Sequence, residues 1–473
     1  MHSRGAWLSS IGLIVPTVLA LAISPVLFSH HPASTNAQGT HQVFIPMAMR
    51  ECEPAPTGGT FSLPPNTSVA LGRSSRLGVW LGDGDSQTVG LLKTTGAKWT
   101  RLVVSWSTIE PTYAEPPSYD FGMYDQLFSA IAAAGMQPIV EIRGNPSWAA
   151  ATSCGPINRL DRFDAFVRAI VAHYMVPTYN VKHWEFYNEP ENTSTTWGSF
   201  LGGCFGNTPD KYVEMLRVAY NAVKQTDGEA KVVLGGLALG QHTDPNEGPI
   251  FNTAFLTQTL ALNGGAYFDI ANIHYFSSQN SQWSQYGLDI AGKANAIRQF
   301  MANYGVTKPV VATELSWTST PADSPDTPEQ QARYVPKVLA RGLANDLYAM
   351  TWFLLSEWNG ADYPYGLLDI HEEPRPAYYA FRVAACEFGS ARAVRPLSAG
   401  EVGVAGGVEG YVFDVSGQER WVLWSSADGT AVPVSLPRGI IRAADKLGRI
   451  IPLGNGPAQI TLDGSPIYLR MQR

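Results

Sequence analysis

Eight short apolar segments, rich in β-branched and aromatic residues, recur along the chain and alternate with segments of helical periodicity. Such alternation is typical of a parallel sheet whose successive strands are connected by helices. Eight strands over roughly 310 residues, from Gly78 to Glu387, predict a (β/α)8 TIM barrel of the α/β class. The predicted strands are Leu77–Leu81, Thr100–Trp106, Pro138–Ile142, Lys182–Tyr187, Lys231–Leu234, Phe268–His274, Pro309–Thr313 and Met350–Leu355.

The segments between these strands carry helical signals. Two helices are expected to begin at Thr208-Pro209 and at Thr327-Pro328, where a capping residue precedes proline. A doubly wound open sheet is the alternative fold, but Gly82-Asp83-Gly84-Asp85 lacks the third glycine of a phosphate-binding turn. Another segment repeats apolar residues at spacings of three and four, as on one stripe of a helix: Phe163, Phe166, Val167, Ile170, Val171 and Tyr174.

The periodicity changes after Phe388. Apolar residues such as Tyr411, Phe413 and Val415 then alternate with small or polar ones, in short runs separated by Gly, Pro and Asp. This alternation is typical of strands with one buried face. We therefore expect a barrel over residues 67–388 and a C-terminal β-sandwich domain over residues 389–473.

The N-terminal segment has the features of an export signal. No Asp, Glu, Lys or Arg occurs between Arg4 and Arg50, and residues 11–28 are almost continuously apolar. We expect residues 1–37 to be a secretory signal peptide, with an uncleaved membrane anchor as the alternative because the apolar run nearly reaches spanning length. Residues 38–66 are expected to form an N-terminal arm or linker. Both alternatives predict a secreted or cell-surface protein.

Export makes the four cysteines candidates for two disulfides. We favour Cys154 with Cys204, because both follow predicted strands on the same face of the barrel, and Cys52 with Cys386. Four cysteines allow three connectivities, and buried free thiols are the alternative. No two cysteines have CxxC spacing, so we expect no structural metal.

The charge balance excludes several partners. The chain carries 33 basic and 40 acidic residues, for a net charge of −7. No global positive field attracts nucleic acid or anionic lipid, so we expect no nucleic-acid partner and no membrane contact beyond an N-terminal anchor. The 13 tryptophans of a weakly charged chain suit neutral, hydroxyl-rich ligands. We expect a monomer that binds carbohydrate and needs no cofactor.

Glutamates stand at the ends of two predicted strands. Catalytic residues of a (β/α)8 barrel lie at the carboxyl ends of its strands. The fourth strand leads into Asn188-Glu189-Pro190, and the seventh ends at Thr313-Glu314. Two carboxyl groups across the mouth of a barrel suit an acid and a nucleophile flanking a glycosidic bond. No His, Cys or Asp set at metal-ligand spacing competes for the site. Other strand ends add hydrogen-bonding groups: Arg101, Asn145, His274 and Tyr275.

These motifs resemble those of glycoside hydrolase clan A. The resemblance rests on Asn188-Glu189-Pro190 after an aromatic strand, on Ala312-Thr313-Glu314 and on the pair His274-Tyr275. Within the clan, the chain is most similar to the β-xylosidase-like family 39 and the cellulase-like family 5. Further matches are Arg101 with Trp106, Ile109-Glu110-Pro111, Asn145-Pro146-Ser147-Trp148-Ala149 and Pro374-Arg375-Pro376-Ala377-Tyr378-Tyr379.

The resemblance implies a role for each matching polar residue. Glu189 would be the acid/base and Glu314 the nucleophile. Asn188 would hydrogen-bond the 2-hydroxyl group of the sugar in the −1 subsite, and Arg101 would keep Glu314 ionised. The implied activity is that of an O-glycosyl hydrolase.

Two positions depart from the clan pattern. Many members have His-x-Tyr on strand six, whereas this chain has His274-Tyr275-Phe276. His274 and Tyr275 would line the floor of the site, and which of them contacts Glu314 stays open. Trp352 matches the clan's sugar-facing tryptophan loosely, and Trp358 is the rival. Other loop tryptophans are expected to divide between sugar platforms and packing: Trp148, Trp197, Trp283 and Trp317.

The sequence therefore predicts a retaining glycoside hydrolase that cleaves β-O-glycosidic bonds in plant-type or microbe-type oligosaccharides or polysaccharides with two glutamates. Exo and endo action both remain open. The alternative is a non-catalytic glycan-binding cell-surface protein built on a glycosidase-like barrel. Among the neighbouring acids, Glu141 and Glu185 are expected to pair inside the barrel, Glu191 to lie on the rim and Glu110 to cap a loop.

Overall fold

The computed structural model describes residues 68–72, 74–82, 84–193, 205–240, 250–317, 327–357, 365–453 and 458–472. The signal peptide or anchor, the arm, Trp197 and Trp358 lie outside these residues. These features therefore stay predictions, and so do the domain boundaries.

Cys154 and Cys386 are both disulfide-bonded. The partners predicted for them, Cys204 and Cys52, lie outside the described residues. The connectivity therefore also stays a prediction.

A closed parallel barrel forms the larger part of the described chain. Its eight strands pair in the order β6-β5-β4-β3-β2-β9-β8-β7, and bridges from Val233 to Ile270 and from Leu237 to Ile273 join the two end strands. Each predicted strand corresponds to one observed strand in the predicted order, so the (β/α)8 TIM barrel is confirmed. The strands are β2 (Leu77–Gly82), β3 (Trp99–Ser105), β4 (Gln137–Arg143), β5 (His183–Phe186), β6 (Lys231–Val233), β7 (Ala271–Phe276), β8 (Val310–Ser316) and β9 (Met350–Trp352).

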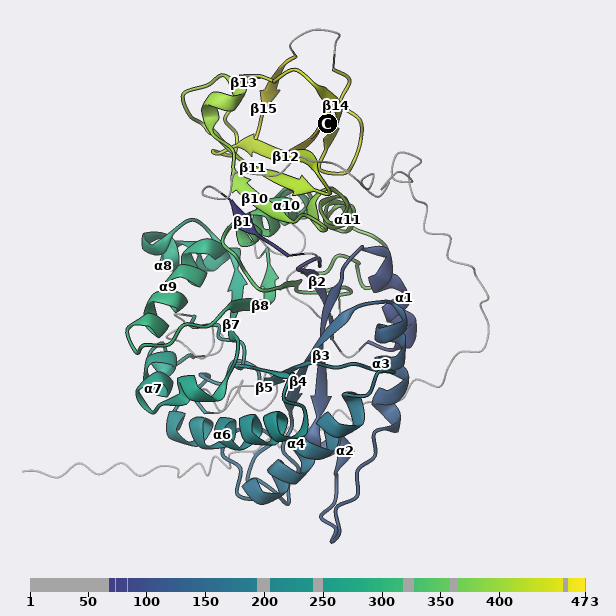
Figure 1. Cartoon of the computed structure of the whole chain (residues 1–473), viewed down its shortest axis with the longest axis vertical. Helices are drawn as coiled ribbons and strands as arrows, with labels where there is room; N and C mark the ends of the chain where they lie inside the picture. The colour runs from purple at the N-terminus through teal and green to yellow at the C-terminus, as the bar shows by residue number, and fades with distance from the viewer. Residues whose placement is uncertain are drawn as a thin grey trace, which may run out of the picture. The chain divides into compact units, whose positions relative to one another are not determined.

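Helices surround the barrel (Figure 1), because each buries one apolar stripe against the strands. In α4 (Leu160–Tyr174), all six predicted stripe residues are buried. The helices α6 (Pro209–Thr226) and α10 (Thr327–Ala344) begin within one residue of the predicted positions. The others are α1 (Ser86–Thr94), α2 (Trp106–Ile109), α3 (Gly122–Ala133), α7 (Phe255–Ala261), α8 (Asn280–Trp283), α9 (Ile290–Ala302) and α11 (Pro376–Phe388), with 3-10 turns η2 (Gly264–Tyr267), η3 (Ser277–Gln279), η4 (Ser284–Tyr286) and η5 (Ala399–Val402).

The barrel interior changes from apolar to charged along the strands. Trp99 of β3 and Ile139 of β4 face the interior. Arg101 and Glu141 follow them by two residues, so they lie on the same side of their strands. These two side chains and Glu185 are fully buried. An apolar floor thus lies beneath a charged layer that leads to the mouth. The floor consists of Trp99, Ile139, Val233, Ile270, Val311 and Ala349.

Two antiparallel sheets form the predicted β-sandwich, which is confirmed. A six-stranded sheet has the order β1-β10-β11-β12-β16-β14, and β13 pairs with β15. The sheets bury a common core that includes Val412, Trp421 and Leu462. One strand was not predicted: β1 precedes the barrel in the chain but pairs with β10. The strands are β1 (Val69–Ala70), β10 (Ala393–Pro396), β11 (Val408–Val415), β12 (Gln418–Ser425), β13 (Val432–Ser435), β14 (Ile440–Asp445), β15 (Gln459–Leu462) and β16 (Ile467–Met471).

The sandwich packs on α11, the last barrel helix. The rings of Phe388 and Phe413 stack with their centroids 4.6 Å apart, and Glu387 forms an ion pair with Arg470 at 2.9 Å. Phe413 belongs to the alternating set seen in the sequence, whereas its neighbour Val412 fills the core between the sheets. Both faces of β11 are therefore buried.

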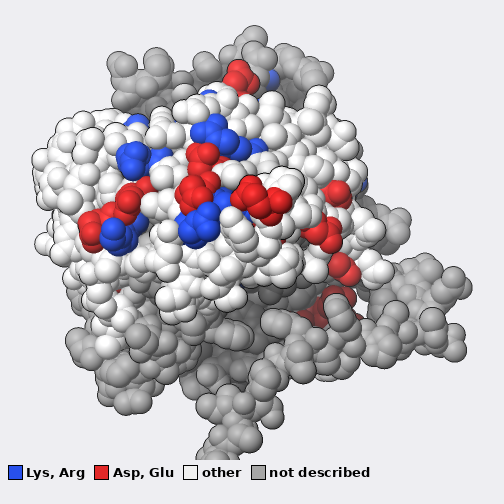
Figure 2. Space-filling model, turned by 90° about the horizontal axis from the view of Figure 1, so that it is seen from below, with Lys and Arg blue, Asp and Glu red and all other residues white. Residues whose placement is uncertain are grey.

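The described surface shows no concentration of one charge on the face drawn in Figure 2, where basic and acidic side chains are interspersed and most of the surface is uncharged. This distribution agrees with the modest net charge of −7. Among the helices of the described ranges, none combines the length and hydropathy that a membrane span requires.

Candidate active site

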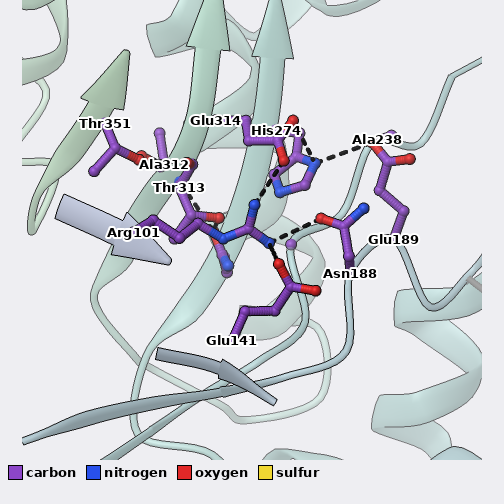
Figure 3. Close-up of polar contacts among 12 residues, drawn as sticks. Arg101, Glu141, Asn188, Glu189, Ala238, His274, Ala312, Thr313, Glu314 and Thr351 are labelled. Atoms are coloured by element: carbon purple, nitrogen blue, oxygen red, sulfur yellow. Dashed lines mark hydrogen bonds and ion pairs between the residues drawn. The ribbon is translucent and has the colours of Figure 1, made fainter. Parts of the chain in front are cut away.

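The two predicted catalytic glutamates meet at the carboxyl ends of the barrel strands (Figure 3). Glu314 lies in β8, and Glu189 follows the end of β5. One carboxylate oxygen of each glutamate and one ring nitrogen of His274 all lie within 4.8 Å of one another. The side chains of Glu189 and Glu314 are 13% and 10% exposed. The pair is therefore close together and accessible from solvent.

An irregular turn carries Glu189 to this position. Tyr187 and Glu189 have φ angles of 64° and 43°, in the left-handed region that residues with side chains seldom adopt. The backbone N–H of Glu189 donates to Gly236 O over 3.0 Å, which ties the turn to the chain just after β6. Unusual backbone of this kind concentrates at functional sites, where the surroundings hold it in place.

A register shift in β8 turns Glu314 toward the barrel interior. β7 and β8 pair regularly as far as Ala312, and then His274 pairs with Glu314, so that Thr313 is skipped. Asn272 Oδ1 accepts hydrogen bonds from the backbone N–H of Thr313, at 3.2 Å, and from its hydroxyl, at 2.9 Å. Because a bulge re-aims the following side chain, Asn272 helps to fix the direction of Glu314.

Arg101 connects the charged layer to Glu314, as Figure 3 shows. Its Nη1 donates to Glu314 at 2.6 Å, and its Nη2 donates to Asn188 at 2.8 Å. The guanidinium also bonds Glu185 through two nitrogens, each at 2.8 Å, and lies 2.9 Å from Glu141. Burial opposes the charge of Arg101, but the surrounding carboxylates outweigh burial and raise its pKa. Arg101 is thus a permanent cation beside Glu314.

The two carboxyl groups have different electrostatic surroundings. Burial raises the pKa of Glu314, and the charge of Arg101 offsets part of that rise. Burial also raises the pKa of Glu189, and the negative charges of Glu314 and Glu191 raise it further. Glu189 therefore keeps its proton to higher pH than Glu314 does.

His274 lies between the two glutamates and is neutral. Its Nδ1 is 3.0 Å from Glu189 Oε1 and 3.6 Å from Glu314 Oε2. Burial lowers its pKa well below the usual range, and the charges of Arg101 and Lys293 lower it further. A neutral imidazole has one N–H, and we assign it to Nδ1 because the carboxylates are on that side.

Gly236 sets the position of His274 from the other side. A Cβ atom at Gly236 would lie 2.0 Å from His274 Nε2. We predict that Gly236→Ala displaces the imidazole and lowers kcat on a β-glycoside by about 100-fold, because small misplacements in an active site have costs of this order. Steady-state kinetics checks this, with Gly228→Ala as the control because its Cβ would meet nothing closer than 3.8 Å. Equal kcat values for the two variants would contradict the prediction.

Two residues predicted to contact substrate do not join this cluster. Tyr275 is next to His274 on β7, so its side chain lies on the other side of the strand. Burial raises the pKa of its hydroxyl, and the negative charge of Asp289 raises it further. Trp352 has no exposed surface, and its indole N–H donates to Tyr365 O over 3.0 Å. The open question about strand six is thereby answered, since His274 is the residue that approaches Glu314.

Four half-buried aromatic rings form a cluster beside Trp352. Phe353, the residue after Trp352, lies 4.9 Å from Trp80 and 5.9 Å from Phe276, measured between ring centroids. Tyr365 lies 5.7 Å from both Phe276 and Phe353. Phe276 ends β7 and Phe353 follows β9 directly, so the cluster is at the carboxyl ends of the strands.

The sequence interpretation missed Lys293, which holds the backbone of His274 beside Glu189. Lys293 is fully buried in α9, and its Nζ donates to His274 O over 2.6 Å and also to Ala238 O. Burial lowers the pKa of Lys293 to about 7. The signal in the sequence was a lysine on the stripe that contains Ile290 and Ile297.

Glu191 is not on the rim, so that prediction was wrong. It has no exposed surface, and its Oε1 accepts a hydrogen bond from Leu239 N over 2.9 Å. After Pro190 the chain continues inward and pairs at Asn192 with Phe251. Burial raises the pKa of Glu191 to about 7.

The remaining strand-end residues stabilise the structure around the site. Glu141 and Glu185 pair with Arg101 inside the barrel, as expected. Asn145 Nδ2 donates to two carbonyl groups of the following loop, at 3.2 and 3.3 Å. Glu110 is buried and accepts a hydrogen bond from the indole of Trp106 over 2.9 Å.

Glu189, His274 and Glu314 offer three donor atoms that could hold a metal ion. Among the described residues, this trio is the one such group of His, Cys, Asp or Glu side chains. Arg101 lies 2.6 Å from Glu314 Oε1. A cation at the trio would lose that oxygen or face the charge of the guanidinium. The donor set therefore suits an acid and a nucleophile better than a metal ion.

Searches with family models and among curated proteins found no match to this chain. Solved structures do match. A family 39 glycoside hydrolase from Bacteroides cellulosilyticus WH2 has a TM-score of 0.65 at 20% identity, over 85% of this chain and 81% of that one. A family 39 β-xylosidase from Caulobacter crescentus has a TM-score of 0.59 at 15% identity, over 86% and 98%. A family 30 endoxylanase from Clostridium papyrosolvens C71 has a TM-score of 0.57 at 11% identity, over 86% and 98%.

These similarities extend over both the barrel and the sandwich, since they cover more than four fifths of the chain. They show that the chain shares the fold of these enzymes, as the sequence motifs predicted. The chain thus has the fold of the family 39 and family 30 glycoside hydrolases, and its resemblance to clan A is confirmed at the level of the fold.

Proposed function

We propose that the protein is a retaining glycosidase that hydrolyses β-O-glycosidic bonds by double displacement, with Glu314 as nucleophile and Glu189 as acid/base. The observation that carries the proposal is the close approach of their carboxylate oxygens, within 4.8 Å. Retaining enzymes hold their carboxyl groups about 5 to 5.5 Å apart, whereas inverting enzymes leave about 6.5 to 9.5 Å for a water molecule.

The first step requires opposite protonation states of the two groups. Glu314, ionised beside Arg101, attacks the anomeric carbon, and Glu189 gives its proton to the departing glycosidic oxygen. The surroundings favour this division, because burial and the charge of Glu314 keep the proton on Glu189. The products are a free alcohol and a glycosyl ester of Glu314.

The second step reverses the role of Glu189. Formation of the ester removes the negative charge of Glu314, and the pKa of Glu189 falls once Glu189 has lost that neighbour. Glu189 then takes a proton from water, whose oxygen attacks the anomeric carbon and releases Glu314. His274, neutral and 3.0 Å from Glu189, donates to the carboxylate without adding a charge.

The proposed substrates are β-linked glycans of plant or microbial origin. Asn188, held by Arg101 at 2.8 Å, would present its amide N–H to the 2-hydroxyl group of the sugar. Xylosides are the first candidates, because similar structures include a β-xylosidase and an endoxylanase. The proposal also retains the expected secretion of the protein, since such polymers lie outside the cell.

We predict a bell-shaped pH profile for kcat/KM. Activity should appear as pH rises through the pKa of Glu314, which burial raises above the usual glutamate value, and should disappear as pH rises through the higher pKa of Glu189. In Glu189→Gln the alkaline limb should vanish on a 2,4-dinitrophenyl β-glycoside, whose leaving group needs no proton. Initial rates from pH 4 to pH 10 measure both limbs.

Glu110→Gln is the matched control for this profile. Glu110 is also a buried glutamate whose pKa burial raises, but it lies outside the carboxyl pair. An alkaline limb that persists in Glu189→Gln, or moves in Glu110→Gln, would contradict the assignment of the acid/base.

A substrate panel tests the function itself. Aryl β-xyloside, β-glucoside, β-mannoside, β-galactoside and α-arabinofuranoside are assayed with xylan and β-glucan, using the parent protein and Glu189→Ala. We expect hydrolysis of at least one β-glycoside, with the anomeric configuration retained when products are followed by NMR. Binding without hydrolysis would instead support the non-catalytic glycan-binding protein, and inversion would overturn double displacement.

A further inference from the structure

A cavity lies outside the carboxyl cluster, between the barrel and the sandwich. It has a volume of about 540 Å³, within the range of about 300 to 1,000 Å³ typical of small-molecule sites. Barrel residues after β7 and β8, the helix α10 from Gln330 to Arg341, and the end of β12 with the chain after it all contribute to its wall. Glu189, Glu314, Arg101 and His274 are not among the residues that line it. We call it the seam cavity.

The cations that line the seam cavity are each neutralised by a carboxylate. Arg333 pairs with Glu329 at 2.8 Å, a carboxylate that it shares with Lys446, and Lys337 pairs with Asp428 across the boundary between barrel and sandwich at 3.0 Å. The third cation, Arg341, has two carboxylate partners, Asp289 and Glu409, each at 2.6 Å. The wall therefore offers charged hydrogen-bonding groups without a net charge that would select an ion.

The rest of the wall combines one accessible aromatic ring with neutral polar groups. Trp317 is half-buried, and its ring lies 5.0 Å from that of Tyr334. Its indole nitrogen is buried and has no hydrogen-bond partner among the described residues. Such a wall suits a ligand with many hydroxyl groups and an apolar ring face. The neutral polar side chains are Ser277, Ser278, Asn280, Gln330 and Ser426.

The seam cavity is connected by short chain segments to the catalytic groups. Trp317 follows Glu314 by three residues, and Ser277 follows His274 by three. Three residues span at most about 10 Å. A polymer held at the carboxyl pair could therefore extend to the seam cavity, whereas a substrate of one sugar could not occupy both.

We propose that the seam cavity is a distal glycan-binding site that holds sugar units of a polysaccharide away from the bond being cleaved. The inference rests on the proposed glycosidase activity and gives the sandwich a function, since Ser426 and Asp428 belong to it. The ligand class is a neutral β-linked glycan segment. Small glycosides bypass the site.

The experiment compares polymer and small substrate. Ser426 is exposed after β12, so Ser426→Trp fills the seam cavity without removing a core contact, and Trp317→Ala removes its aromatic wall. We expect either change to raise KM for soluble xylan by about three- to tenfold, the effect of losing one aromatic contact. Ser426→Trp should leave kcat/KM on an aryl β-xyloside unchanged. Ser435→Trp, exposed on β13 and outside the cavity, is the matched control.

Two results would overturn the proposal. One is an unchanged KM for xylan in both Ser426→Trp and Trp317→Ala. The other is an equal loss on xylan and on the aryl β-xyloside, which would indicate damage to the catalytic centre. If the parent protein hydrolyses no glycoside, the proposed function fails. Titration calorimetry with xylohexaose then tests the seam cavity alone, and equal affinity of parent and Ser426→Trp rejects it.

Discussion

Glu314→Ala should lower the rate of hydrolysis of an aryl β-glycoside by about 10⁴-fold or more, the usual effect of removing a catalytic nucleophile. The fold should survive, because the change removes a buried carboxylate whose pKa burial raises, and Arg101 keeps Glu185 and Glu141 as partners. Stopped assays of released aryl alcohol, with circular dichroism for folding, measure both quantities.

Added azide identifies the role of Glu314. In Glu314→Ala, azide can occupy the vacated space and attack the β-glycoside directly, so the product should be an α-glycosyl azide. In Glu189→Ala, a substrate with a good leaving group still forms the ester with Glu314, and azide then attacks from the opposite face to give a β-glycosyl azide. Wild-type rates in Glu314→Ala, or the same azide anomer from both variants, would contradict the assignment.

Arg101→Met should lower both activity and stability. Arg101 is fully buried and touches three carboxylates, those of Glu185, Glu314 and Glu141. Removal of one member of a buried ion cluster typically costs about 3 to 5 kcal/mol, because the remaining charges lose their partner. We expect a loss of this size in the free energy of unfolding, measured with urea, together with a loss of glycosidase activity.

The deficit of Arg101→Met should shrink as pH falls. Without the guanidinium, the folded state favours protonated carboxyl groups even more than the parent does, so it binds more protons than the unfolded chain, and stability rises toward low pH. Arg143→Met is the control, since Arg143 lies on the neighbouring strand at 3.4 Å from Glu141 but is 27% exposed. Because solvent screens the charge of Arg143, its loss should cost less than the loss of the fully buried Arg101, toward the 0 to 1 kcal/mol that is roughly typical of exposed pairs. Equal unfolding free energies for the two variants would refute the role given to Arg101.

The fold and the approach of Glu189 to Glu314 could be predicted because their signals are local. The hydrophobic runs mark the strands along the chain, and the carboxyl end of each run lies at the mouth of the barrel. Glu189 and Glu314 are at such ends, and Arg101 comes two residues after Trp99 of the apolar floor, on the same side of the strand. Each of these positions can be read from a few neighbouring residues.

The missed features depend on contacts between distant segments or on shifts of one residue. Whether His274 or Tyr275 faces Glu314 depends on the side-chain alternation of β7 and on a bulge that Asn272 holds. Phe353 rather than Trp352 belongs to the aromatic cluster at the carboxyl ends of the strands, because successive residues point to opposite sides. Lys293 lies on a helix stripe that periodicity alone reads as apolar.

The pairing of β1 with β10 has a consequence for the way the chain is made. Val69 is hydrogen-bonded beside Val394, and the whole barrel is synthesised between them. During synthesis, β1 therefore emerges before the barrel but can pair only after β10 has emerged. A fragment that begins at Leu77, or the C-terminal domain alone, leaves β10 as an open sheet edge, which is a template for aggregation. Production of either part in isolation should include residues 68–72, supplied as a peptide or by circular permutation.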